Sequence, residues 1–290
     1  MLNALLKTMR LRQWTKNGFV FFALIFDKQL FIVDSFLRTL AGFFLFCLIS
    51  SAVYLLNDIA DVEADRQHPE KKHRPIASGK LPLNVATGAA VGLIVITLPV
   101  AYYLAPALAL ILAVYLLINI LYSSWLKHIP ILDVLIISAG FVLRVAAGVT
   151  LITVVRFSPW LYVITTLFSL YIGFGKRRAE MTLLEEDASE HRKVFDGYTL
   201  PLIDQYITIV SGTTIVAYSL YTFNTPNLPP NNHSMMLTIP FVVYGIFRYL
   251  QLIQTGHAAG APDEVALKDR PLQITVLLWG LAVIAIFYLS

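Results

Sequence analysis

The chain has 290 residues, of which 57% are hydrophobic and 14% are charged, with a formal net charge of +4. Soluble globular domains carry about a quarter charged residues, so this composition excludes an ordinary soluble domain. Cys47 is the only cysteine, which excludes an intrachain disulfide and a cysteine-based metal site.

Nine apolar segments follow one another along the chain, and most approach the ~20 residues that cross a bilayer core as a helix. We expect spans at residues 17–33, 36–57, 83–103, 106–124, 132–153, 159–175, 202–222, 235–254 and 272–289. The sequence therefore predicts an all-α integral membrane protein with nine transmembrane helices, in which residues 1–290 form a single transmembrane domain.

Basic residues are unevenly distributed over the connections between these spans. The connections on the side opposite the N-terminus contain only Lys28, Arg38 and Arg156. Because cytoplasmic loops carry an excess of Lys and Arg, we expect the N-terminus in the cytoplasm. Most acidic residues map to the same side, which the charge rule does not require. We therefore expect the chemistry of this protein at its cytoplasmic face.

The densest charged connection runs from Asn57 to Gly79 and reads NDIADVEADRQHPEKKHRPIASG. Steps of three and four residues place its first polar side chains on one face, if the preceding helix continues to about Asp65. These residues are Asn57, Asp58, Asp61 and Asp65. Adjacent acids repel one another unless a cation neutralises them, and ligands that are all oxygen suit Mg²⁺. We predict a cation site here, with the following basic run holding a phosphorylated ligand; a solvated loop with incidental charge is the alternative.

Other charged residues lie on the same predicted side. Lys16, in RLRQWTKN, is expected to be an interfacial anchor that can also reach a phosphate. Tyr122 and Lys127 flank the connection before the fifth span, and Arg144 lies inside that span. A charge within a span costs about 2.5–3.5 kcal/mol on insertion scales. Arg144 should therefore face either a polar cavity or a structural partner.

The sixth span ends in GFGKRRAE, where Lys176 and Glu180 are one helical turn apart and Arg177 lies between them. Such clusters are either topology anchors with ion pairs or parts of a site. The acidic motif on the same side favours a site, whereas Arg178 points elsewhere and is interpreted as an anchor. In the charged residues 256–273, we expect Arg270 to contact a substrate.

NDIADVEAD followed by RPIASG resembles the first aspartate-rich motif, NDxxDxxxD, of the UbiA superfamily of intramembrane prenyltransferases. The resemblance implies nine helices around a central cavity, cytoplasmic cap loops and Mg²⁺-diphosphate chemistry. Most members carry a second DxxxD motif after the sixth helix, where this chain has KRRAE. This departure is typical of the decaprenyl-phosphate phosphoribosyltransferase branch. The chain also resembles that branch in RQWTKN, LKHIPILDVLIISAGFVLRVAAG and GAPDEVALKDRPLQ.

That branch implies a multi-pass enzyme of the bacterial cytoplasmic membrane. It would transfer 5-phosphoribose from phosphoribosyl pyrophosphate to a polyprenyl monophosphate, releasing pyrophosphate and supplying arabinose donors for cell-wall polysaccharide. Asp58, Asp61 and Asp65 would bind catalytic Mg²⁺. Substrate contacts would come from Lys16, Asn57, Lys72, Arg74, Tyr122, Lys127, Arg144, Lys176, Arg177, Glu180 and Arg270. We expect the two substrates and the bilayer as partners and no nucleic acid, and a homo-oligomer is compatible with the sequence.

Two other functions stay open at this point. An aromatic polyprenyltransferase of quinone biosynthesis would share the first motif, although the second DxxxD motif is missing here. A lipid-phosphate carrier or transporter would also place charges within spans, although these charges concentrate at one membrane face. Release of pyrophosphate from phosphoribosyl pyrophosphate would separate the first function from both alternatives.

Overall fold

The computed structural model describes residues 1–68, 71–154, 158–186, 197–223, 225–229, 231–255 and 268–289. These residues form helices and contain no β-strand. Seven of the helical segments are long and apolar enough to cross a membrane. They are α3 (Val33–Ala60), α5 (Leu83–Leu104), α6 (Pro106–Ser124), α7 (Leu132–Val149), α9 (Leu200–Phe223), η5 with α10 (Ser234–Gln254) and α12 (Arg270–Leu289). The prediction of an all-α, multi-pass membrane protein is confirmed.

The first predicted span, residues 17–33, is not one continuous helix. The 3₁₀ helix η1 (Leu11–Phe21) leads into the short α2 (Phe22–Phe26), and α3 begins only at Val33. Between α2 and α3, Lys28 has a φ of 58°. That left-handed conformation cannot continue a right-handed helix, so the apolar run is divided.

The sixth predicted span, residues 159–175, lies within a longer helix, α8 (Pro159–Glu186). This helix is not among the seven apolar ones, because serine, threonine and its charged end lower its hydropathy. Part of its polar surface is buried, where Ser169 and Ser138 of α7 are hydrogen-bonded at 2.6 Å. Nine transmembrane helices are therefore not confirmed.

Local chemistry explains several helix ends. Pro106 and Pro240 lie in the first turns of α6 and α10, where a missing N–H costs nothing. Before α5, Gly79 has a φ of 76°, in the left-handed region that glycine adopts most readily. Asp269 precedes α12 and accepts the N–H of Leu272 at 2.9 Å, which caps that helix.

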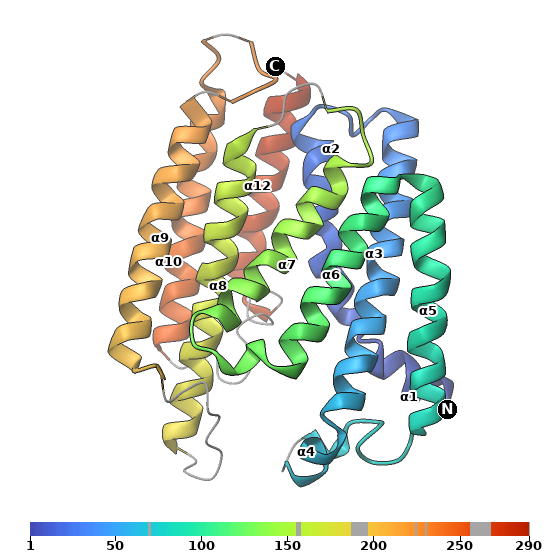
Figure 1. Ribbon diagram of the computed structural model, residues 1–290. Helices are drawn as coiled ribbons and strands as arrows, with labels where there is room; N and C mark the ends of the chain where they lie inside the picture. Colours follow the sequence, from blue (N-terminus) through green and yellow to red (C-terminus); the bar gives the residue numbers. More distant parts are fainter. Residues whose placement is uncertain are drawn as a thin grey trace. The chain divides into compact units, whose positions relative to one another are not determined.

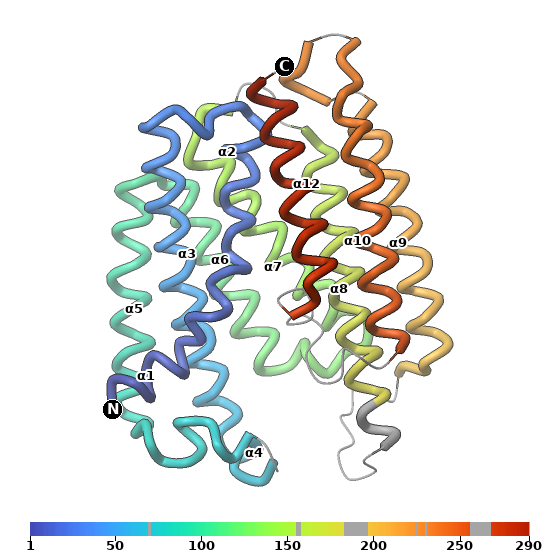
Figure 2. The backbone as a smooth tube through the Cα atoms, turned by 180° about the vertical axis from the view of Figure 1, so that it is seen from behind, coloured from blue at the N-terminus to red at the C-terminus, as the bar shows by residue number. Residues whose placement is uncertain are grey.

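The chain divides into two compact units. Unit 1 contains Met1–Ile25, Gln29–Lys127 and Leu143–Val154; unit 2 contains Phe26–Lys28, His128–Val142 and Val155–Ser290. In unit 1, α3 packs along α5 and α6, and η1 lies against α3 (Figures 1 and 2). In unit 2, α8 packs along α9, and α10 contacts α8, α9 and α12. Helix α7 contributes its first residues to unit 2 and its last to unit 1.

Each unit has its own apolar core. Phe46 and Leu108 are fully buried in unit 1, and Tyr171 and Ile203 are fully buried in unit 2. Large apolar side chains also cover the outside of the helices, as at Leu277, which is 60% exposed. An apolar exterior of this kind suits lipid and not water.

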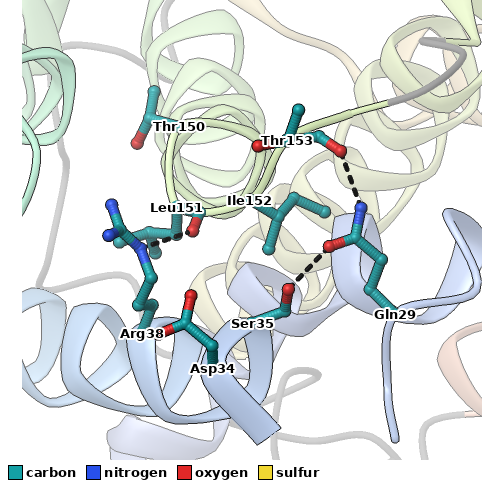
Figure 3. A pocket seen from close by; sticks show the side chains of 8 residues that line it. All are labelled: Gln29, Asp34, Ser35, Arg38, Thr150, Leu151, Ile152 and Thr153. Carbon is teal, nitrogen blue, oxygen red and sulfur yellow. Dashed lines mark hydrogen bonds between the residues drawn. The ribbon is translucent and has the colours of Figure 1, made fainter. Parts of the chain in front are cut away.

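A polar pocket of about 280 Å³ lies within unit 1 (Figure 3). Arg38 on α3 donates from Nε to the carbonyl of Leu151 and from Nη2 to that of Leu104, both at 3.1 Å. Leu104 is the last residue of α5, and Leu151 follows the C-terminal end of α7, where a cation is favourable. Gln29 donates to the carbonyl of Thr153 at 2.7 Å. Side chains in the pocket wall therefore connect the ends of neighbouring helices by hydrogen bonds.

Candidate functional site

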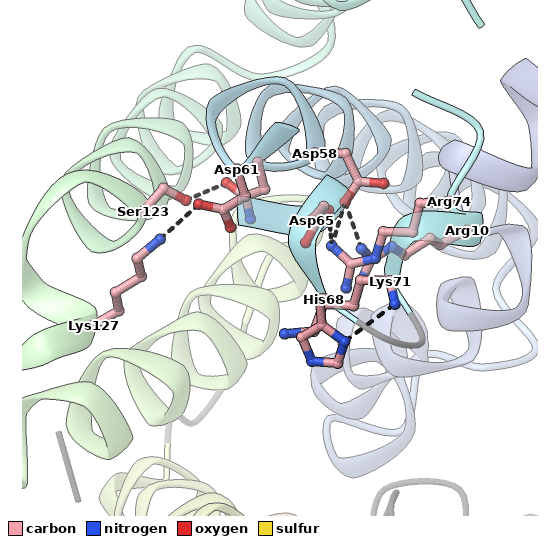
Figure 4. A network of polar contacts seen from close by, with 10 residues as sticks. Arg10, Asp58, Asp61, Asp65, His68, Lys71, Arg74, Ser123 and Lys127 are labelled. Carbon is pink, nitrogen blue, oxygen red and sulfur yellow. Dashed lines mark hydrogen bonds and ion pairs between the residues drawn. The ribbon is translucent and has the colours of Figure 1, made fainter. Parts of the chain in front are cut away.

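The acidic motif occupies the end of α3 and the short helix α4 (Val62–Gln67). The expected continuous helix to Asp65 is interrupted, because α3 stops at Ala60 and Asp61 adopts φ −93° and ψ 7°. Backbone hydrogen bonds from Asp61 to Asn57 and from Asp65 to Asp61, at 2.9 and 2.8 Å, span the break. The carboxylates consequently turn to two sides and not to one (Figure 4).

Asp58 and Asp65 form the first side and share one arginine. Nη1 of Arg74 lies 3.2 Å from Asp58 Oδ1 and 2.8 Å from Asp65 Oδ2. Arg10 donates to the same oxygen of Asp58 at 2.7 Å, and its guanidinium lies 4.8 Å from the centroid of the Tyr54 ring. Both aspartates are buried, at 3% and 4% exposure, so each needs a fixed counter-charge. Two of the three predicted metal ligands are thus held by arginines.

Asp61 forms the second side with residues from the end of α6. Nζ of Lys127, in η3 (Leu126–His128), lies 2.8 Å from Asp61 Oδ1. Next to this pair, Ser123 donates a hydrogen bond to Asn57 Oδ1. Lys127 and Asp61 are 66 residues apart in the sequence. The fold therefore brings two separately predicted segments of the site together within unit 1.

The donor chemistry of this cluster fits Mg²⁺, because Asp58, Asp61 and Asp65 offer only carboxylate oxygens. Among the residues that the structure describes, no three acidic, histidine or cysteine side chains converge as a metal-binding group. Mg²⁺ commonly completes its shell with water and substrate phosphates and takes only one or two carboxylates. The cluster therefore fits an ion that a phosphorylated substrate shares.

Arg144 lies in a buried network of unit 1. Its Nε donates to Asn17 Oδ1 at 2.8 Å and its Nη2 to the Tyr115 hydroxyl at 3.0 Å. The guanidinium also lies 5.1 Å from the centroid of the Phe46 ring, a cation–π contact. Arg144 is 6% exposed. These contacts favour the structural alternative for Arg144 over direct contact with a substrate.

The remaining predicted residues of unit 1 lie at its surface or close to it. Lys16 and Tyr122 are half-buried, and Lys72 is exposed within η2 (Lys71–His73). In unit 2, Lys176 is half-buried and Arg270 is exposed at the first residue of α12. Residues 187–196 and 256–267, which complete two of the charged stretches, lie outside the described residues.

The charged cluster in the C-terminal third of α8 is an ion-pair network within unit 2. Arg177 Nε donates to Asp133 Oδ2 at 2.5 Å, and Arg177 Nη1 donates to Glu180. Tyr198 donates from its hydroxyl to Asp133 Oδ1 at 2.8 Å. Burial raises the pKa of Tyr198, as does the adjacent Asp133 carboxylate, so the hydroxyl stays protonated and donates. Arg178 pairs with Asp204 on α9 at 2.6 Å, as expected of an anchor.

Known proteins with a similar sequence identify the family. The UbiA prenyltransferase family matches this chain over residues 18–268. The chain belongs to the UbiA prenyltransferase family. This UbiA family member is 34% identical to the decaprenyl-phosphate phosphoribosyltransferase of Corynebacterium glutamicum, over 99% of this chain and 87% of that protein. It is 35% identical to the decaprenyl-phosphate phosphoribosyltransferase of Mycolicibacterium smegmatis, over 100% of this chain and 94% of that protein.

Solved structures share the UbiA fold of this chain. A UbiA homologue from Archaeoglobus fulgidus bound to DMAPP and Mg²⁺ matches with a TM-score of 0.74 and 15% identity, over 99% of both chains. A digeranylgeranylglyceryl phosphate synthase matches with a TM-score of 0.66 and 18% identity, over 100% of this chain and 99% of the other. At these identities the likeness shows the fold alone. The predicted family is confirmed by the family model and by the two phosphoribosyltransferase relatives.

Four residues that were not predicted as site residues belong to one or the other of the two clusters in this UbiA family member. They are Arg10, Ser123, Asp133 and Tyr198. Each lies at least 44 residues along the chain from the partner that it reaches. The one signal in the sequence was that these charged and hydroxyl side chains lie near the predicted motifs. Helical spacing relates residues three or four positions apart, so it could not predict contacts over such separations.

Proposed function

We propose that this UbiA family member transfers 5-phosphoribose from phosphoribosyl pyrophosphate to a polyprenyl monophosphate. The observation that carries the proposal is the 34–35% identity to two decaprenyl-phosphate phosphoribosyltransferases over nearly the whole chain. An oxygen of the lipid phosphate would attack C1 of the ribose, and the bond from C1 to the pyrophosphate would break. The lipid phosphate is already ionised at neutral pH, so positioning and electrostatics matter more than a strong base.

The acidic cluster of unit 1 is the proposed donor site. Asp58, Asp61 and Asp65 would hold Mg²⁺, which when bound neutralises negative charge on the departing pyrophosphate. Asn57 accepts from Ser123 through Oδ1, which leaves its Nδ2 to donate to a phosphate or ribose oxygen. The proposal thus gives Asn57 and the three aspartates of the cluster roles suited to their chemistry.

Cations around the two clusters would bind the phosphates of the substrates. Arg74 and Lys127 already contact the acids that would carry the metal, so a phosphate bound there would also meet them. Lys16, Lys72, Tyr122 and Arg270 are proposed as further contacts, and Lys176 as a contact of the acceptor phosphate. Arg144, because of its burial, is proposed to stabilise the fold instead.

We propose that this chain crosses the bacterial cytoplasmic membrane nine times, with its N-terminus, cap loops and reaction on the cytoplasmic side. The seven apolar helices would be joined by α8 and by the irregular segment of η1 and α2. The uneven distribution of Lys and Arg supports this orientation. One domain would contain all nine passages.

Cysteine labelling of whole cells should reveal this orientation. In a Cys47→Ala background, Lys80→Cys should resist an impermeant thiol reagent in intact cells and react after permeabilisation. His233→Cys should react without permeabilisation, because seven passages, an odd number, separate it from the cytoplasmic N-terminus. Both positions are exposed, so access to the reagent reports membrane side. The reverse labelling pattern would contradict the orientation.

The proposed reaction is tested with purified protein, phosphoribosyl pyrophosphate, decaprenyl phosphate and Mg²⁺. We expect pyrophosphate and a lipid heavier by one phosphoribosyl group, in equal amounts. With 4-hydroxybenzoate and a polyprenyl diphosphate we expect no product, because KRRAE replaces the second acidic motif. Prenylation of the aromatic acid without pyrophosphate release from phosphoribosyl pyrophosphate would overturn the proposal. No turnover of either substrate pair would favour a lipid-phosphate carrier.

A further inference from the structure

The polar pocket of unit 1 lies at the end of α3 that is remote from the acidic cluster (Figure 3). The 28 residues of α3 extend about 42 Å, which exceeds the ~30 Å thickness of the bilayer core. Arg38, in the pocket wall, lies near the start of this helix, and Asp58 lies near its end. The pocket and the acidic cluster therefore belong to opposite membrane–water interfaces.

Side chains close to the pocket indicate the same depth in the membrane. Arg38 donates to the carbonyl of Leu104, and Tyr102 and Tyr103 are exposed in the preceding turn of α5. Exposed tyrosines concentrate at the level of the lipid headgroups. On α3, the apolar side chain of Leu37 is exposed next to Arg38. The pocket therefore lies where phospholipid headgroups are abundant.

The pocket contains a cation and an anion that do not pair with each other. Arg38 uses Nε and Nη2 to donate to the carbonyls of Leu151 and Leu104. Its Nη1 has no hydrogen-bond partner within the described part of the chain. Asp34, one helical turn before Arg38, also lines the pocket and forms no ion pair with any residue that the structure describes. Figure 3 shows both side chains extending from α3 toward Leu151.

These two charges select a ligand that carries a phosphate close to an ammonium group. A phosphate oxygen would accept a charge-assisted hydrogen bond from Nη1 of Arg38, and an ammonium N–H would donate to the Asp34 carboxylate. The volume of about 280 Å³ is several times the ~30 Å³ that a water molecule occupies. It is smaller than most pockets for drug-sized ligands. The pocket therefore suits a small headgroup and not a whole lipid.

We propose that this pocket binds the headgroup of a phospholipid with a primary amine, of the phosphatidylethanolamine type. Arg38 contacts the phosphate and Asp34 contacts the ammonium group. The acyl chains lie along exposed apolar side chains of α3, such as Leu37 and Phe44. Because Arg38 already connects the ends of α5 and α7, the bound headgroup stabilises unit 1. This site is separate from the proposed transfer reaction and does not depend on it.

Thermal unfolding in lipid nanodiscs tests this proposal without any measurement of transfer. The discs contain phosphatidylcholine with increasing fractions of phosphatidylethanolamine or of its N-methylated derivatives. Each methyl group removes one N–H donor but keeps the phosphate and the positive charge. A ligand that binds only the folded state raises its stability by mass action. The unfolding midpoint of the wild type should therefore rise with the ethanolamine fraction, and less with each added methyl group.

Asp34→Asn is the decisive variant, because Asp34 is exposed and its loss should leave the fold intact. The ethanolamine fraction that gives half of the rise should increase about threefold to tenfold, as for a lost contact with an exposed charge. Glu63→Gln makes the same change of charge beyond the other end of α3 and should behave like the wild type. Arg38→Gln should weaken the binding of every phospholipid. It also removes bonds to α5 and α7, so Asp34→Asn decides the test if Arg38→Gln does not fold.

Equal midpoints of the wild type in ethanolamine and choline discs would overturn the proposal, as would an unchanged ethanolamine preference in Asp34→Asn. A larger rise with phosphatidylglycerol, which has no ammonium group, would show that the pocket takes an anionic headgroup and would also overturn it. In detergent, soluble O-phosphoethanolamine should raise the midpoint less than phosphatidylethanolamine at the same concentration. An equal rise would show that the ligand is a free solute and not a lipid.

Discussion

Asp61→Asn is expected to lower the transfer rate by a factor on the order of 100 or more, with the protein still folded. Asparagine is neutral, so position 61 would no longer offer a negative charge to the metal. The free energy of unfolding would change little. Asp61 and Lys127 are 37% and 26% exposed, and exposed ion pairs contribute only about 0–1 kcal/mol. The rate is measured as lipid-linked phosphoribose formed, and folding as the thermal unfolding midpoint.

Glu63→Gln is the matched control for this prediction. Glu63 belongs to the same charged segment but is 76% exposed and pairs with Arg66 at 2.8 Å, away from the cluster. Its substitution should leave the rate unchanged. Asp58 is a poorer test residue, because it is buried between Arg10 and Arg74 and its loss would also destabilise the fold.

Removal of divalent ions provides an independent check on the role of Asp61. EDTA should stop the wild-type reaction, and added Mg²⁺ should restore it. Full turnover in EDTA, or an Asp61→Asn variant as active as Glu63→Gln, would contradict a metal role for the acidic cluster.

Arg144→Met is expected to reduce the free energy of unfolding by about 1–4 kcal/mol. Methionine keeps much of the length of the side chain, but it cannot donate to Asn17 Oδ1 or to the Tyr115 hydroxyl. Both acceptors would then be left in the interior of unit 1. The thermal unfolding midpoint in detergent should fall by several degrees, and the activity per folded molecule at low temperature should be retained.

Arg12→Met makes the same chemical change at an exposed arginine near the start of η1. The thermal unfolding midpoint of Arg12→Met should equal that of the wild type. An Arg144→Met variant that keeps the wild-type midpoint but loses activity would show that Arg144 contacts a substrate. That result would restore the cavity-facing alternative for this residue.

The sequence by itself determined the properties that depend on neighbouring residues. Helical rise relates the length of an apolar run directly to bilayer thickness, so seven spans could be placed from composition alone. The motif NDIADVEAD was sufficient, with the other motifs, to identify the family. The two spans that were not confirmed are those where a local feature interrupts the pattern, as the left-handed Lys28 does after α2.

Only the tertiary structure decided which charges meet. Arg177 meets Glu180 within one helix, as spacing allows, but it also pairs with Asp133, 44 residues away, which spacing could not predict. The pairs of Arg10 with Asp58 and of Lys127 with Asp61 span 48 and 66 residues. Periodicity relates residues within one helix, but contacts between helices depend on how the helices pack. A sequence therefore shows where charge lies, and packing selects its partner.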